Sequence, residues 1–159
     1  MNLNDTYGSD EPAGDRLLDE FDLTRNVSHL LRRAHFRAEA IFKEVMDGHE
    51  LTPRQKALLL AARQRPGATV NELAKQIALD RNSTAEMLGR LVQQGLLEKT
   101  PAPKDRRASA VYITEDGSDL LRAVMSDDQR VEDRIVEPLP EEYRPLFLKC
   151  LRIMNGLEE

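Results

Sequence analysis

A basic stretch at residues 103–114, PKDRRASAVYIT, concentrates side chains that are suited to binding an anion. Its four charged residues are consecutive: Lys104, Asp105, Arg106 and Arg107. Lysine and arginine neutralise phosphates and displace their counterions, so such a cluster suits contact with a nucleic-acid backbone. The alternative is an exposed charged loop that contributes less than ~1 kcal/mol to stability.

A second set of polar side chains precedes this stretch, in a segment with helical periodicity: Arg81, Asn82, Ser83, Glu86 and Arg90. Asparagine can pair bidentately with adenine, and arginine with guanine or with phosphate. The N–H groups at a helix N-terminus can also hold a phosphate. Glu86 can accept a hydrogen bond from cytosine N4 or pair with Arg90 one turn later, and we favour the pair within the helix.

The net charge of −5 seems to argue against a nucleic-acid partner. Residues 1–20 alone carry six acids and one base, so this segment accounts for the acidity of the chain. Residues 80–107 carry six bases and four acids, which is a local net charge of +2. Local charge governs contact with phosphates, and the total charge therefore does not exclude a nucleic-acid partner.

The composition limits the class of protein. With 159 residues, 40% of them apolar and only 4% aromatic, the chain fits one mainly helical domain with a substantial core. No apolar run approaches the ~20 residues needed to cross a bilayer, and the acidic N-terminus does not resemble a secretory signal. The single Cys150 excludes an internal disulfide, so we expect a cytoplasmic protein with no membrane partner.

Local signals place the elements that must position the polar residues. Thr52-Pro53 and Asp80 are helix starts, and the residues from Thr69 to Glu72 form a capping box. Pro101 is expected to end a strand. On apolar spacing, we expect Thr84, Met87, Leu88 and Leu91 to be core. Helices are predicted over residues 22–47, 53–65, 69–77, 81–94, 114–136 and 141–155, with strands at 96–100 and 109–113.

This order predicts a mainly α (α+β) fold: a winged helix-turn-helix with N- and C-terminal dimerisation helices. Residues 1–18 would form a mobile acidic arm, residues 51–114 the DNA-binding domain, and residues 19–50 and 115–159 the dimerisation region. The outer helices have apolar faces that the central unit is too small to bury, and a second subunit would bury them. The alternative is a monomeric helical bundle.

Three segments together resemble the MarR family of bacterial transcriptional regulators: LTPRQKALLL, TVNELAKQIALDRNSTAEMLGRLVQQGLLEKT and DRRASAVYITEDGSDLL. The resemblance spans residues 51–121. It implies a homodimer whose two winged domains bind successive major grooves of a pseudo-palindromic operator. Most members repress transcription and release DNA when a small ligand binds or a cysteine is oxidised.

The resemblance also assigns roles in the wing. In similar proteins an Asp-x-Arg pair folds the wing tip and its arginine enters the minor groove, which here implies Asp105 and Arg107. The negative potential of a narrow minor groove would attract that guanidinium. Lys104 and Arg106 would then contact phosphates.

The same resemblance places an effector pocket where the first, second and fifth helices of the family fold meet. His29 and Arg33 share a helix face, and His35 lies beside Arg32. An arginine and a histidine beside aliphatic side chains could hold a small aromatic carboxylate. We therefore expect ligand contacts from His29, Arg33 and His35. The alternative for each residue is a solvated basic helix face.

Other switches and classes are less well supported. Oxidant sensing needs an accessible thiolate, whereas Cys150 lies in an apolar pattern and is expected to be core. The histidines are too irregularly spaced to predict a metal site, although a redox- or metal-responsive regulator is the alternative function. No catalytic set, phosphate loop or cofactor motif is recognisable, so we expect no enzyme activity.

Overall fold

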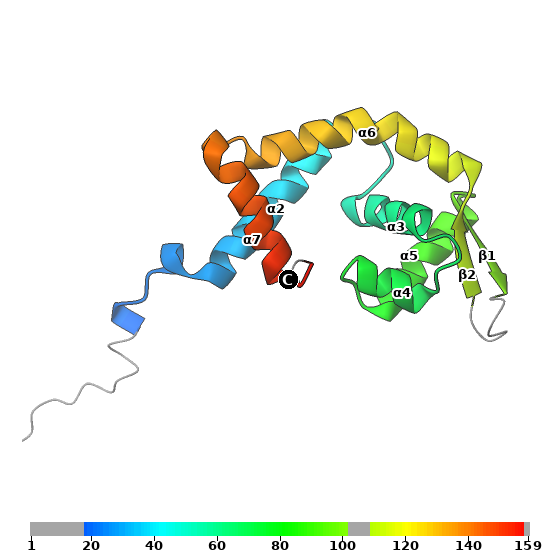
Figure 1. Ribbon diagram of the computed structural model, residues 1–159, viewed down its shortest axis with the longest axis horizontal. Helices are drawn as coiled ribbons and strands as arrows, with labels where there is room; N and C mark the ends of the chain where they lie inside the picture. The colour runs from blue at the N-terminus through cyan, green and yellow to red at the C-terminus, as the bar shows by residue number, and fades with distance from the viewer. Residues whose placement is uncertain (1–17, 102–108, 158–159) are drawn as a thin grey trace, which may run out of the picture. The chain divides into compact units, whose positions relative to one another are not determined.

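A computed structural model describes residues 18–101 and 109–157 of the chain. Its elements are, in order, η1 (Leu23–Arg25), α2 (Val27–Val45), α3 (Pro53–Gln64), α4 (Val70–Gln76), α5 (Arg81–Gln93), β1 (Leu97–Pro101), β2 (Ser109–Ile113), α6 (Glu115–Val136), η2 (Glu141–Tyr143) and α7 (Arg144–Met154) (Figure 1). The described part of the chain divides into two compact units, one ending at Arg37 and one beginning at Ala38, and α2 crosses the boundary. The predicted class, mainly helical with one small antiparallel sheet, is confirmed.

The first long helix starts later than predicted, at Val27 rather than near Asp22. Asp22 instead caps the separate turn η1, where its carboxylate accepts a hydrogen bond from the Thr24 N–H at 2.8 Å. Asn26 then has extended backbone, and its side chain accepts from the His29 N–H at 3.0 Å. Two capping residues in succession divide a segment whose apolar spacing alone predicts one helix.

Helices α3, α4 and α5 begin where their capping residues predict. Thr52 and Thr69 each form a capping box with the residue three positions later, Gln55 and Glu72 respectively. Pro53 occupies the first turn of α3, where a missing N–H leaves no hydrogen bond unmade. The three helices cluster beside the hairpin in Figure 1. They enclose a core that includes Leu58, Leu59, Leu73, Leu88 and Leu91.

The hairpin is antiparallel, with Leu97 paired to Ile113 and Pro101 to Ser109. β1 ends at Pro101 and includes this proline, one residue beyond the predicted strand 96–100. In this two-stranded sheet β1 is an outer strand, so the absent proline N–H removes no necessary bond. Val111 on β2 also bridges to Ala68. The Val111 N–H donates to the Ala68 carbonyl at 3.0 Å, and the Val111 carbonyl accepts from the Gly67 N–H at 2.9 Å.

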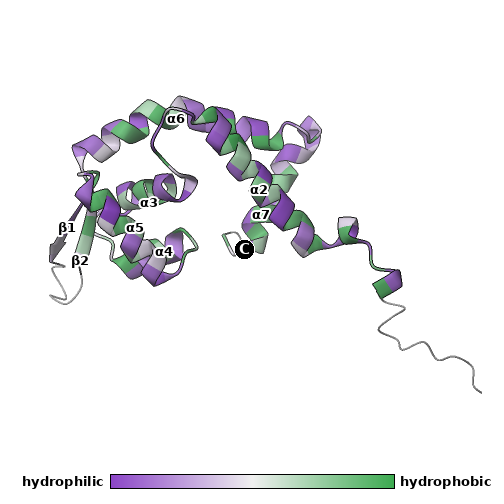
Figure 2. Cartoon of the chain, turned by 180° about the vertical axis from the view of Figure 1, so that it is seen from behind, coloured by the Kyte–Doolittle hydropathy of each residue, from purple (hydrophilic) through white to green (hydrophobic). Residues whose placement is uncertain are grey.

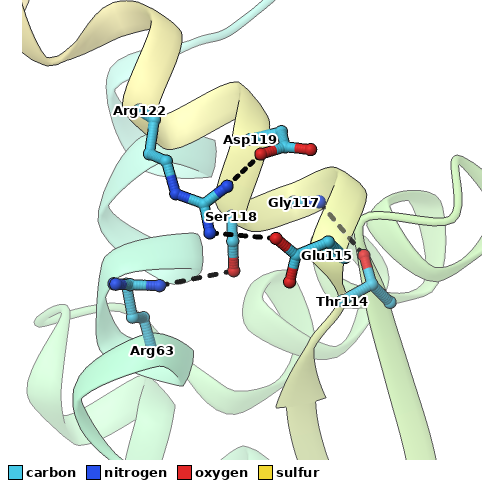
Figure 3. A network of polar contacts seen from close by, with 7 residues as sticks. All are labelled: Arg63, Thr114, Glu115, Gly117, Ser118, Asp119 and Arg122. Carbon is cyan, nitrogen blue, oxygen red and sulfur yellow. Dashed lines mark hydrogen bonds and ion pairs between the residues drawn. The ribbon is translucent and has the colours of Figure 1, made fainter.

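Helix α6 begins at a small polar network drawn in Figure 3. The Thr114 hydroxyl accepts from the Gly117 N–H at 3.1 Å and donates to the Gly95 carbonyl at 2.6 Å. From α3, Arg63 donates to the Ser118 hydroxyl at 3.4 Å. These contacts attach the start of α6 to both the hairpin and the three-helix cluster.

The predicted last helix divides into η2 and α7, because Pro140 and Pro145 favour a short turn before the helix is established. Green and purple segments alternate along α6 and α7 in Figure 2, as expected for amphipathic helices. The two differ in burial: α6 buries Leu121, Val124 and Val131, whereas α7, which is described throughout, buries no residue within the chain. Within the described ranges, no helix combines the length and the apolar character that a bilayer span requires.

Candidate nucleic-acid interface

The first turn of α5 presents the polar set predicted from the sequence. Arg81, Asn82 and Ser83 are all exposed, and so is Glu86 one turn later. The opposite face carries Thr84, Leu88 and Leu91, each with no exposed surface, while Met87 is half-buried. The core of this helix is thus as predicted, and its outer face is available for base edges and phosphates.

Asp80 caps α5 directly beneath this polar turn. Its carboxylate accepts from the Ser83 N–H at 2.9 Å. Hydrogen bonds from the Ser83 side chain and from the Ser83 backbone N–H to the carboxylate hold the pKa of Asp80 below the ordinary aspartate value. The cap orients the residues that are proposed to meet DNA and adds a negative charge at the positive end of the helix.

The Asp80 cap predicts a dependence of stability on pH. A carboxylate with a lowered pKa in the folded state stabilises the fold above its unfolded pKa, and this contribution disappears as pH falls through the folded pKa. We expect wild type to melt higher than Asp80→Asn at pH 7. This difference should shrink below about pH 4, near the unfolded aspartate pKa. Thermal melts by circular dichroism from pH 7 to pH 3 measure it, and a constant difference would contradict the assignment.

Glu86 and Arg90 form the predicted pair within α5. Arg90 Nη2 donates to Glu86 Oε1 at 2.5 Å, and both side chains are 68% exposed. Such an exposed pair contributes little to stability. Its consequence is geometric, because Glu86 holds the Arg90 guanidinium on the outer face of α5.

One further cation near α5 was not anticipated from the sequence. The exposed Arg54, in the first turn of α3, lines a hollow of about 200 Å³ together with Ser83 and Arg90. In the sequence, nothing distinguishes an arginine that directly follows the first proline of a helix as a DNA-contacting residue. Only the packing of α3 against α5 brings Arg54 to the edge of the candidate interface, where a phosphate contact is possible.

The predicted wing residues lie in the connection between β1 and β2. Lys104, Asp105, Arg106 and Arg107 fall outside the described residues, so their roles stay predictions. The strands on both sides are described, and they form the predicted hairpin.

The predicted ligand residues lie in the N-terminal unit, on α2. His29 is half-buried, whereas Arg33 and His35 are exposed. The contact seen is between Arg32 Nη2 and His29 Nδ1, at 3.3 Å, and these two residues help to line a groove of about 370 Å³ with Phe21. His35 packs against Phe36 with ring centroids 5.9 Å apart. Within this unit His29 is therefore joined to Arg32 rather than to Arg33.

The expectation that Cys150 is core is wrong for the single chain, because its side chain is exposed. Spacing placed Cys150 correctly on an apolar stripe, but none of the described residues covers α7 at that point. Among the described residues there is no group of three or more histidine, cysteine or acidic side chains arranged to hold a metal ion.

A three-helix cluster that carries an antiparallel hairpin, with an exposed polar turn at the start of its third helix, defines a winged helix-turn-helix fold. A model of the MarR family matches residues 51–109. The HTH-type transcriptional repressor NicR of Pseudomonas putida is 32% identical over 139 residues, which cover 87% of this chain and 88% of NicR. The chain belongs to the MarR family of transcriptional regulators.

Two solved structures extend the likeness. BpsR of Bordetella bronchiseptica, whose DNA binding is regulated by 6-hydroxynicotinic acid, superposes with a TM-score of 0.78 at 26% identity, covering 86% of this chain and 98% of BpsR. The transcriptional repressor CouR, bound to a 23-mer DNA duplex, gives a TM-score of 0.76 at 29% identity, covering 83% of this chain and 94% of CouR.

Proposed function

We propose that this regulator is a homodimeric repressor that binds a pseudo-palindromic operator and is released by a small aromatic carboxylate. The observation that carries the DNA-binding part is the first turn of α5, where Arg81, Asn82 and Ser83 are exposed opposite a fully buried face. Helices of this kind enter the major groove with their N-terminal residues toward the base edges. The DNA-bound structure of CouR supports the same use of the fold.

In this proposal the helix and the wing have separate tasks. Asn82 and Arg81 read base edges, and Ser83 and Arg90 contact the DNA beside those bases. Glu86 orients Arg90 or accepts a hydrogen bond from a cytosine. Arg107, oriented by Asp105, enters the minor groove, while Lys104 and Arg106 contact phosphates.

Exposed apolar side chains support the homodimer. In the N-terminal unit these include Leu18, Phe21, Leu23, Val27, Leu30 and Leu31. On α7 they include Leu146, Leu148, Ile153 and Met154, between 51% and 60% exposed. Several large apolar side chains exposed on one element are typical of an interface, and a second copy of the chain is the partner that we propose. In this arrangement residues 19–50 and 115–159 form the dimerisation region and residues 51–114 the DNA-binding domain.

The proposed effector is a hydroxylated aromatic or pyridine carboxylate. The regulation of BpsR by 6-hydroxynicotinic acid supports this class of ligand. In this chain His29 and its neighbours Arg33 and His35 would take the carboxylate, with Arg32 already in contact with His29. Phe21, which lines the same groove as His29, would supply an apolar wall for the ring.

The test combines operator binding with release. The full-length protein should bind DNA from upstream of its own gene, with a logarithmic affinity that falls linearly with the logarithm of salt concentration. Adding 6-hydroxynicotinate or a related acid should weaken this binding by about 5- to 150-fold, the usual range of allosteric coupling. Alanine at His29, Arg33 and His35 together should abolish the release but leave binding intact.

Each part of the proposal has its own contradicting result. DNA binding that does not depend on salt concentration would refute the proposed DNA interface. Unchanged release from the triple-alanine variant would refute the ligand residues. Release by peroxide in wild type but not in Cys150→Ser would favour the oxidant-responsive alternative.

A further inference from the structure

Asp128 occupies a position in α6 where an apolar side chain is expected. The buried stripe of this helix contains Leu121, Val124 and Val131, and Asp128 lies between the last two, four residues after Val124 and three before Val131. Only 9% of Asp128 is exposed. A buried carboxylate is unfavourable unless a charged or hydrogen-bonding partner compensates for its lost hydration.

Lys56 on α3 is that partner. Its Nζ contacts Asp128 Oδ1, and the two side chains are only 13% and 12% exposed. The same Nζ lies 5.5 Å from the ring centroid of Phe42, which is buried near the end of α2. One largely buried ammonium group therefore contacts two other helices, and α2, α3 and α6 meet at this point.

The neighbouring polar contacts of α6 are more exposed. His49 Nε2 lies 3.2 Å from Asp127 Oδ2, with side chains 29% and 26% exposed. Arg134 donates to both carboxylate oxygens of Glu44, at 2.9 and 3.1 Å, and is 41% exposed. Exposed pairs can shift or exchange with water at little cost. The buried pair cannot, because moving α3 along α6 would set Lys56 and Asp128 against apolar side chains.

We propose that the Lys56–Asp128 pair is a positioning device for DNA binding, which holds the winged domain at one place along α6. This inference rests on the proposed function, in which α6 belongs to the dimerisation region. The position of α3 on α6 then sets the separation of the two recognition helices. The spacing between operator half-sites is the feature of the DNA that this separation must match.

The main test replaces both partners, because removing one would leave a buried charge and unfold the chain. Lys56→Met with Asp128→Leu substitutes apolar side chains of similar volume, a change that often leaves stability unaltered or raised. We expect the melting temperature to be at least that of wild type. A melting temperature far below wild type would show a stabilising pair and contradict a purely positioning role.

The functional readout is spacing preference on duplexes that wild type selects from a random pool. One base pair inserted between the half-sites rotates one of them by about 35°, and should weaken wild-type binding by about tenfold. The double variant should discriminate less than about threefold between the two spacings, since its winged domain can shift along α6. A well-folded double variant that keeps the wild-type ratio would overturn the inference.

Two controls separate position from charge. Lys56→Gln with Asp128→Asn keeps a directional hydrogen-bonding pair, and should retain the wild-type spacing preference. Asp119→Asn with Arg122→Gln removes an exposed pair that lies entirely within α6 (Figure 3), and should also retain it. Loss of the preference in the amide pair or in the exposed control would count against the assignment.

A measurement without DNA separates this inference from the proposed function. Spin labels at Gln93 on α5 and Glu132 on α6, both exposed, report the placement of the winged domain on α6. The labelled protein carries Cys150→Ser and is diluted with unlabelled protein, so that only distances within one chain contribute. If wild type selects no duplex, the proposed function fails. A distance distribution that is broader in the apolar double variant still supports the positioning role, and an unchanged one overturns it.

Discussion

Asn82→Ala should lower the affinity for a selected operator by about 5- to 150-fold, the loss expected when one bidentate contact to a base is removed. The residue lies at the second position of α5, exposed, with the buried Thr84 and Leu88 facing the opposite way. Truncating Asn82 therefore disturbs no packing in the core. The loss should be confined to operator DNA, because binding to unrelated duplexes depends on phosphate contacts that the variant keeps.

A matched control is available in the preceding helix. Asn71 is also an exposed asparagine at the second position of its helix, α4. Asn71→Ala should leave the ratio of operator to non-operator affinity unchanged. Fluorescence anisotropy at several salt concentrations measures both variants. If Asn82→Ala keeps the wild-type ratio, or if Asn71→Ala loses it equally, Asn82 does not read a base.

The elements that the sequence predicts best are those set by local hydrogen bonds. Thr52, Thr69, Asp80 and Thr114 each cap a helix at the predicted position, because a capping side chain binds an N–H group only a few residues away. The same rule explains the error at the first helix. Asn26 is a capping residue too, and apolar spacing alone hid it.

Contacts between distant residues could not be predicted in the same way. Asp128 lies in an apolar stripe, but nothing in its own helix indicates that Lys56, 72 residues earlier, is its partner.

The burial of Cys150 could not be predicted from the sequence either. Periodicity identifies the apolar stripe that carries Cys150, yet it does not show whether another element covers that stripe, and among the described residues Cys150 is exposed. Spacing along α2 likewise allows His29 to meet Arg32 or Arg33, and only the side-chain rotamers decide.

Gly117→Ala should destabilise the fold by at least about 2 kcal/mol, through overpacking at the start of α6. A methyl group at this position would overlap the carbonyl oxygen of Leu96 and lie 2.9 Å from Ile113 Cγ1. The Leu96 carbonyl belongs to the backbone just before β1 and accepts from the Thr114 N–H at 3.2 Å. It cannot retreat without disturbing the junction between α6 and the hairpin. For a chain of this size the change should lower the melting temperature by at least about 4–8 °C.

Gly89→Ala is the control, because it makes the same substitution in a helix with a different environment. Gly89 lies within α5, and a methyl group there meets nothing within 4 Å. This variant should gain about 0.5–1 kcal/mol, since alanine restricts the unfolded chain more than glycine does. Both melts need equal protein concentrations, because the stability of the proposed dimer would depend on concentration. A lower melting temperature for Gly117→Ala together with a higher one for Gly89→Ala would attribute the loss to the Leu96 contact. A wild-type melting temperature for Gly117→Ala would show that α6 does not approach the hairpin this closely.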